Sequence, residues 1–101
     1  MIQPEVFEVR VIETTPEYSH VEVKLQGVNR KIINNGGDTF YRCMGGSAVF
    51  YMGGTPHPLR HGDEPLLILR GTPYQDMSPG GVILEACTIP PFDPEQITYL
   101  D

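Results

Sequence analysis

Alternation of apolar and polar residues is the sequence feature that most limits what this chain can fold into. Within residues 19–26, Val21, Val23 and Leu25 occupy every second position, and polar residues stand between them. A similar alternation covers residues 5–12. Because successive side chains of a strand point to opposite faces, this period predicts β-strands with one buried face. No segment shows the 3.6-residue period of a long helix, so we expect an all-β fold.

Turn-forming residues divide the rest of the chain. Eleven Gly and ten Pro residues occur without a fixed period, which predicts many turns between short strands. We expect turns at 34–37, 45–46, 53–56, 62–63, 71–73 and 78–81. We expect strands at 39–44, 47–52, 57–60, 66–69, 74–77 and 82–89. Of these, the wholly apolar run 66–69 suits a strand that is buried on both faces.

The C-terminal part ends this series of strands. Asp93 has the position of a helix N-cap and Pro94 that of a first helical residue, so a short helical turn is expected there. With eight or nine short strands before it, the chain is predicted to form one β-sandwich or β-barrel domain over residues 1–101.

Charge and hydropathy exclude several classes of partner. The formal net charge is −6, which disfavours binding to a phosphate backbone, so no nucleic-acid partner is expected. No apolar run approaches the roughly 20 residues that span a bilayer, so no membrane partner is expected. The N-terminal residues lack the basic start of a signal peptide. We therefore expect a cytoplasmic protein whose Cys43 and Cys87 are reduced.

Two short motifs in the second half resemble those of the cupin superfamily. An acid, six residues and a glycine run from Asp38 to Gly45, and Gly62-Asp63 precedes a Gly-Thr-Pro-Tyr sequence at 71–74. The Ile-Pro-Pro-Phe-Asp sequence at 89–93 is also similar to the end of many small cupins. The resemblance implies a double-stranded β-helix, the cupin jelly-roll barrel.

The metal ligands of that family are largely missing. Its metal-binding members usually supply a His-x-His pair, a Glu and a final His, which suit transition metals. Here residues 30–37 contain no His, Asp38 stands where the Glu would be, and Tyr74 stands where the final His would be. We expect no metal and no other cofactor. The three histidines are expected to face solvent: His20, His57 and His61.

The resemblance also implies a cavity lined by four polar side chains. The family's acid points into the barrel, and if Asp38 does so, alternation places Phe40, Arg42 and Met44 on the same face. Tyr74 and Asp76 would point inward from the other motif. The expected ligand-binding residues are Asp38, Arg42, Tyr74 and Asp76.

These side chains suggest roles but leave alternatives open. Arg42 would bind a carboxylate or phosphate through its planar guanidinium. Tyr74 would donate a hydrogen bond or act as an acid, and Asp38 or Asp76 would act as a base. Alternatively, Arg42 and Asp38 form a buried structural ion pair, or a register slip of one residue places Arg42 in solvent.

Three functions fit this reading. The first, which we favour, is metal-free binding of a small polar or anionic molecule in the cavity. The second is a metal-independent isomerase or epimerase that uses Tyr and Asp for proton transfer. The third is a metal-dependent dioxygenase or lyase with atypical ligands. The sequence assigns no catalytic residue.

The family resemblance also implies a homodimer. If the alternation above is correct, an apolar outer face is available for it, formed by Tyr41, Cys43, Val49 and Tyr51. The same face could instead pack against residues 5–12.

Overall fold

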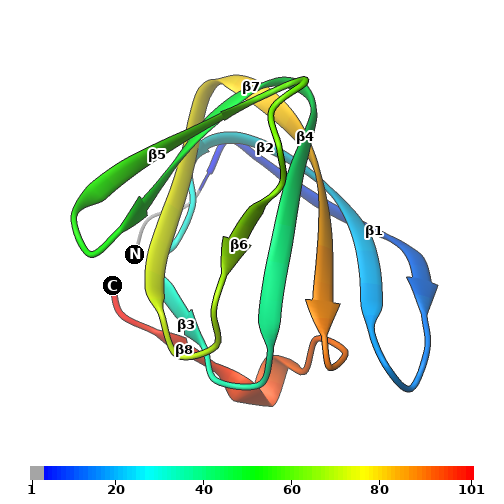
Figure 1. The fold of residues 1–101 in the computed structure, drawn as a ribbon. Coiled ribbons are helices and arrows are strands. Elements are labelled where there is room, and N and C mark those ends of the chain that lie inside the picture. The colour runs from blue at the N-terminus through cyan, green and yellow to red at the C-terminus, as the bar shows by residue number, and fades with distance from the viewer. Residues whose placement is uncertain (1–3) are drawn as a thin grey trace.

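The computed structural model describes residues 4–101, which form one curled antiparallel sheet and a short 3-10 helix, η1 (Figure 1). In chain order the elements are β1 (Val6–Thr14), β2 (Ser19–Val28), β3 (Ile32–Asn34), β4 (Asp38–Met52), β5 (Thr55–Arg60), β6 (Leu66–Ile68), β7 (Pro73–Ile89), η1 (Pro94–Gln96) and β8 (Ile97–Tyr99). Within residues 4–101, no helix is long and apolar enough to cross a membrane.

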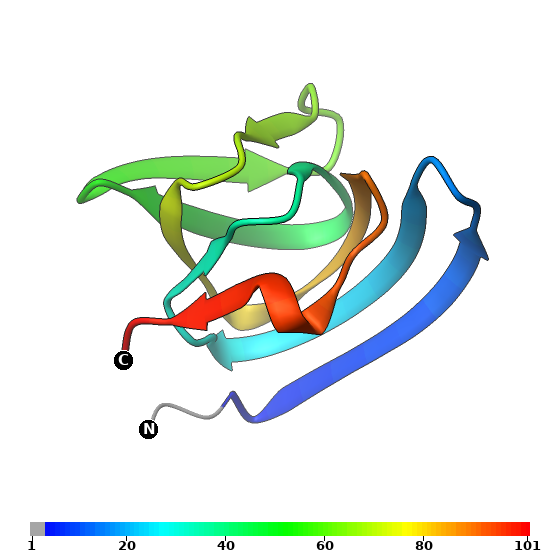
Figure 2. The same cartoon turned by 90° about the horizontal axis from the view of Figure 1, so that it is seen from below.

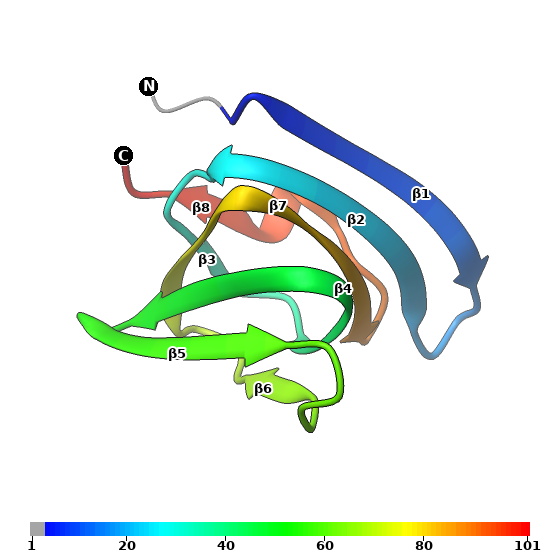
Figure 3. The same ribbon diagram turned by 90° about the horizontal axis from the view of Figure 1, so that it is seen from above.

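The sheet curls into an open barrel because its two longest strands, β4 and β7, bend. The strand order is β1-β2-β7-β3-β8, and β4 pairs with β5, β6 and β7. Seen from below and from above, β2, β7 and β4 curve around a common interior (Figures 2 and 3). β1 continues this wall beyond β2, and η1 and β8 lie across the lower end (Figure 2). This all-β architecture is the predicted fold class.

Bulges take the place of two of the predicted turns. The sequence indicated a break at Gly45-Gly46 and a turn at 78–81, but β4 and β7 continue through both. The pairing of β4 with β7 shifts register on both sides of these glycines, and such bulges bend a strand without ending it. Gly46 has a φ of +74°, and a Cβ there would lie 2.3 Å from the Gly81 carbonyl oxygen, so only glycine fits.

The two N-terminal strands and the C-terminal turn form where the sequence pattern predicted them. The buried face expected for 5–12 is not found, because all nine residues of β1 are exposed. β1 and β2 coincide with the alternating segments, and they pair antiparallel with Val9 opposite Val23. The Asp93 side chain accepts a hydrogen bond from the Glu95 N–H at 3.0 Å and so caps η1. β3 and β8 were not expected, because three residues are too few to show a period.

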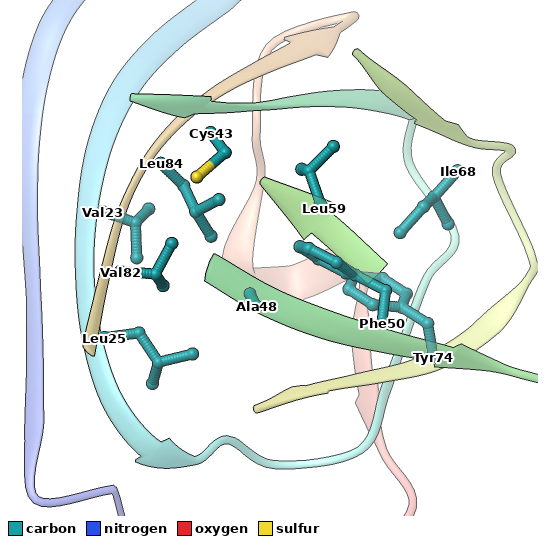
Figure 4. Close-up of a cluster of buried hydrophobic side chains, with 10 residues drawn as sticks. All are labelled: Val23, Leu25, Cys43, Ala48, Phe50, Leu59, Ile68, Tyr74, Val82 and Leu84. Carbon is teal, nitrogen blue, oxygen red and sulfur yellow. The ribbon is translucent and has the colours of Figure 1, made fainter. Parts of the chain in front are cut away.

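The hydrophobic core fills one end of the barrel (Figure 4). Its fully buried members come from β2, β4 and β7, and the largest are Phe50, Leu25, Leu84 and Cys43. Ile68 packs against them, but its neighbours Leu67 and Leu69 are exposed. The prediction that 66–69 is buried on both faces is therefore wrong. Within residues 4–101, β6 pairs with β4 alone, and it turns one face to the core and the other to solvent.

Candidate functional site

A cavity of about 540 Å³ opens between β1, β2, β7 and the C-terminal segment. This volume is within the range of small-molecule sites. Val23 and Tyr74 belong both to its lining and to the core, so the core forms its floor. Most of its wall is apolar, and its polar side chains include Tyr41, Tyr74 and Asp76.

Two tyrosines meet at the floor of this cavity. Tyr41 comes from β4 and Tyr74 from β7, and their hydroxyl oxygens lie 2.7 Å apart, so that either hydroxyl can donate to the other. The Tyr41 ring packs against Phe50 with centroids 4.8 Å apart and meets the Tyr74 ring edge-on at 6.0 Å. Burial raises the pKa of both phenols above their usual value, so both remain protonated donors at neutral pH.

Asp76 is the buried carboxyl group of the site. Asp76 is only 4% exposed, and the Asn29 side-chain amide donates a hydrogen bond to its Oδ1 at 3.2 Å. Asn29 is itself held, because its N–H donates to the Asp76 carbonyl at 3.0 Å and its own carbonyl accepts from Gln75 Nε2 at 2.8 Å. Burial raises the pKa of Asp76 to about 6, although the hydrogen bond from Asn29 opposes the change.

These three groups are electrostatically close. The charge of Asp76 contributes to the raised pKa of both tyrosines. A carboxyl group with a pKa of about 6 can accept or release a proton near neutral pH, and two phenols beside it can donate hydrogen bonds. The cluster can therefore bind hydroxyl or carbonyl groups and can exchange a proton with them.

A basic residue at the rim of the cavity already has interaction partners. Arg30 lines the cavity, but its Nε donates to Asp101 Oδ1 at 3.0 Å and its guanidinium lies 3.8 Å from the centroid of the Tyr99 ring. Deeper in the wall, the Thr39 and Thr88 hydroxyl oxygens lie 3.2 Å apart and satisfy each other.

The predicted orientation of Arg42 and Asp38 is wrong. The Arg42 side chain is 57% exposed on the outer face of β4, and its guanidinium lies 3.3 Å from Glu85 Oε2. Asp38 Oδ1 accepts a hydrogen bond from the Arg70 N–H at 2.8 Å, which ties β4 to the loop before β7. β4 thus presents Thr39 and Tyr41 to the interior. This is the arrangement that a register slip of one residue produces, and the alternation of residues alone does not exclude it.

The same inversion divides the outer face expected for a dimer. Cys43 is buried in the core and Tyr41 lines the cavity, whereas Val49 and Tyr51 lie on the strand face opposite the buried Ala48 and Phe50. The inward orientation of Tyr74 and Asp76 is confirmed, while their binding role stays a prediction. Sequence reasoning missed Tyr41 and Asn29. The charge of Arg42 could have indicated that Tyr41 points inward, because burying the strand face without a charged residue costs less free energy.

The histidines are scattered over the surface. His20 Nε2 lies 3.3 Å from Glu85 Oε2 on the outer face, and His61 is exposed. Among the residues that the structure describes, no three His, Cys, Asp or Glu side chains are grouped so that they could hold a metal ion.

Comparisons with known proteins bear on the fold. No family model and no curated protein matches the chain. Among solved structures, a variant of Streptomyces PAC13 with uridine aligns at 15% identity and a TM-score of 0.86, covering 99% of this chain and 82% of that one. Another structure of Pac13, described as a unique nucleoside dehydratase, aligns with a TM-score of 0.84 at 15% identity, covering 98% of this chain and 82% of that one.

Two further structures show the same architecture. A double-stranded β-helix protein of Klebsiella pneumoniae aligns over 100% of this chain and 90% of its own, with 15% identity and a TM-score of 0.80. A cupin-2 domain protein of Shewanella frigidimarina aligns over 86% of this chain and 82% of its own, with 18% identity and a TM-score of 0.72. The chain therefore has the fold of the cupin superfamily, the double-stranded β-helix that its two short motifs indicated.

Proposed function

We propose that the cavity binds a small, uncharged, hydroxyl-bearing molecule of about nucleoside size. The observation that carries this proposal is the cluster of Tyr41, Tyr74 and Asp76 at the floor of a cavity of about 540 Å³. Phenol and carboxyl groups that are buried together form hydrogen bonds with hydroxyl groups, and such bonds specify a ligand because an unsatisfied polar group is costly there.

The charge of the site favours a neutral ligand over an anionic one. Asp76 is mostly ionised at pH 7 if its pKa is about 6, and it would repel an anion. The expectation of an anionic ligand rested on Arg42, which lies on the outer face. Arg30 at the rim is already paired with Asp101.

A nucleoside suits both halves of the cavity. Its sugar hydroxyls match the polar floor, and its planar base matches the apolar wall that Phe7, Val9 and Val21 contribute. The likeness to Pac13 is consistent with this class. Two variants of that protein, each solved with uridine, replace one tyrosine by phenylalanine, and the two replaced tyrosines are 34 positions apart. In this chain Tyr41 and Tyr74 are 33 positions apart.

A titration with uridine tests the binding proposal. Isothermal titration calorimetry should give one saturable site per chain. Asp76→Asn and Tyr74→Phe should each weaken binding by about tenfold, the usual effect of one lost hydrogen bond. Arg42→Ala is the matched control and should bind as the wild type does. If uridine and a panel of other nucleosides and free sugars all fail to bind, or if Arg42→Ala weakens binding as much as the cavity variants, the assignment is wrong.

Proton-transfer catalysis is the second candidate function, and the raised pKa of Asp76 is the observation that favours it. In a dehydration, Asp76 would take a proton from carbon, and Tyr74 would give a proton to the departing hydroxyl, which leaves as water while a carbon–carbon double bond forms. In an isomerisation, the same carboxyl group would return the proton to another carbon. Incorporation of solvent deuterium into a bound nucleoside, lost in Asp76→Asn, would support catalysis; binding without exchange would support a binding protein.

A further inference from the structure

β1 is an edge strand that exposes apolar side chains. Within residues 4–101 it pairs with β2 alone, and all of its nine residues are exposed. Its five large apolar side chains are 37–64% exposed: Val6, Phe7, Val9, Val11 and Ile12. Figure 3 shows β1 as the outermost strand beside β2. A long edge strand with so much apolar surface is a template for pairing with another strand.

The sequence of β1 is complementary to itself. In an antiparallel pair of identical strands that keeps each face of the sheet continuous, one residue must lie opposite its own copy. If that residue is Val9, then Phe7 lies opposite the partner's Val11 and Glu8 lies opposite the partner's Arg10. A centre at Glu8 or at Arg10 would place two like charges opposite each other, which is unfavourable.

The neighbouring strand strengthens this match. On the outer face of the sheet, Glu8 lies opposite Lys24, and Arg10 forms an ion pair with Glu22 at 3.1 Å. Two sheets joined at Val9 would carry the row Lys24, Glu8, the partner's Arg10 and the partner's Glu22, in which the sign of the charge alternates at every step. On the inner face the same join gives a row of Val23, Val9 and their two copies.

We propose that two copies of the chain form a homodimer in which their β1 strands pair antiparallel over Val6–Ile12, around a two-fold axis at Val9. The dimer differs from the one that the sequence suggested, because it uses β1 and not the face of β4. It also adds to the cavity. Phe7 and Val9 line the cavity, and the partner's Val11 lies beside Phe7 at its open side. This inference is independent of the nature of the ligand.

Charge exchange tests both the dimer and its register. Glu8→Arg places arginines opposite each other at two symmetric positions, and Arg10→Glu does the same with glutamates. Each variant should raise the dissociation constant of the dimer by on the order of 100-fold. An equimolar mixture of the two variants restores both opposite-charge pairs and should form heterodimers. Arg60→Glu is the control, because it makes the same charge change at an exposed position of β5.

The assay is sedimentation equilibrium of the full chain, with circular dichroism to confirm that each variant folds. Wild type and Arg60→Glu should sediment as dimers, at twice the chain mass of 11.3 kDa. Glu8→Arg alone and Arg10→Glu alone should sediment near the chain mass. The equimolar mixture of these two variants should sediment as a dimer. Monomeric wild type would overturn the dimer. Single variants that remain dimeric, or a mixture that remains monomeric, would overturn the pairing at Val9, even if a variant were destabilised.

Discussion

Replacing Asp76 by asparagine should make the protein more stable at neutral pH. The Asp76 carboxyl group is buried, and its pKa is raised from 3.8 to about 6 in the folded protein. In that interval the folded protein binds more protons than the unfolded chain. The contribution of Asp76 to the free energy of unfolding therefore falls as the pH rises from about 4 to about 6, and it is level above about pH 7.

The size of the effect follows from this shift. One pKa unit corresponds to 1.36 kcal/mol, so ionised Asp76 destabilises the folded state by about 3 kcal/mol. The substitution keeps an oxygen that accepts the hydrogen bond from Asn29, so most of this amount should be recovered. We expect Asp76→Asn to gain about 1–3 kcal/mol at pH 8 and at most about 0.5 kcal/mol at pH 4. The gain at pH 8 corresponds to roughly 10 °C in the midpoint of thermal unfolding.

Urea unfolding at several pH values from 4 to 8 measures this difference. Only the difference between variant and wild type is diagnostic. The pKa values of Glu22 and Asp101, two partly covered surface carboxyl groups that pair with arginines, are lowered, so these groups make stability rise with pH in both proteins. Glu64→Gln, which removes an exposed carboxylate, is the control and should change stability by less than about 0.5 kcal/mol at any pH. If the difference between Asp76→Asn and wild type is the same at pH 4 and pH 8, the reasoning is refuted.

Three further sets of substitutions test the site and the fold by urea unfolding. Tyr41→Phe and Tyr74→Phe should each lower the free energy of unfolding by about 1 kcal/mol, and the double variant by less than their sum, because both remove the same hydrogen bond; additive losses would contradict the pairing. Arg42→Ala should change stability by less than about 1 kcal/mol, since its ion pair is exposed; a larger loss would contradict its outward position. Gly46→Ala should cost at least about 1–3 kcal/mol because of its positive φ and its contact with the facing strand, while Gly45→Ala, which has open space around its Cβ, should cost much less; equal losses would show that the bulge does not require glycine.

Most strands of this protein are signalled by residues that are neighbours along the chain, so the sequence could predict them. Alternation at 5–12 and 19–26 gave β1 and β2, and the two short motifs indicated the cupin fold. Asp93 and Pro94 located η1. These features depend on residues that are neighbours along the chain, so no tertiary information was needed.

The face that each strand turns inward was decided only by the tertiary structure. Period two fixes which residues share a face, but it does not say which of the two faces is concave. In β4 both faces carry large apolar residues, Phe40 and Met44 on one and Tyr41 and Cys43 on the other. The assumption that Asp38 points inward therefore inverted residues 38–44, while Val49 and Tyr51, beyond the bulge, face outward as expected.

Long-range pairing also formed the site. Tyr41 and Tyr74 are 33 positions apart, and Asn29 and Asp76 are 47 apart. They meet because β4 and β7 pair along their bent length and because the chain after β2 turns back to β7. The sequence by itself determined the strands and the family of fold. The curvature of the sheet and its register, which arise from bulges and from packing between distant segments, decided which side chains face the cavity.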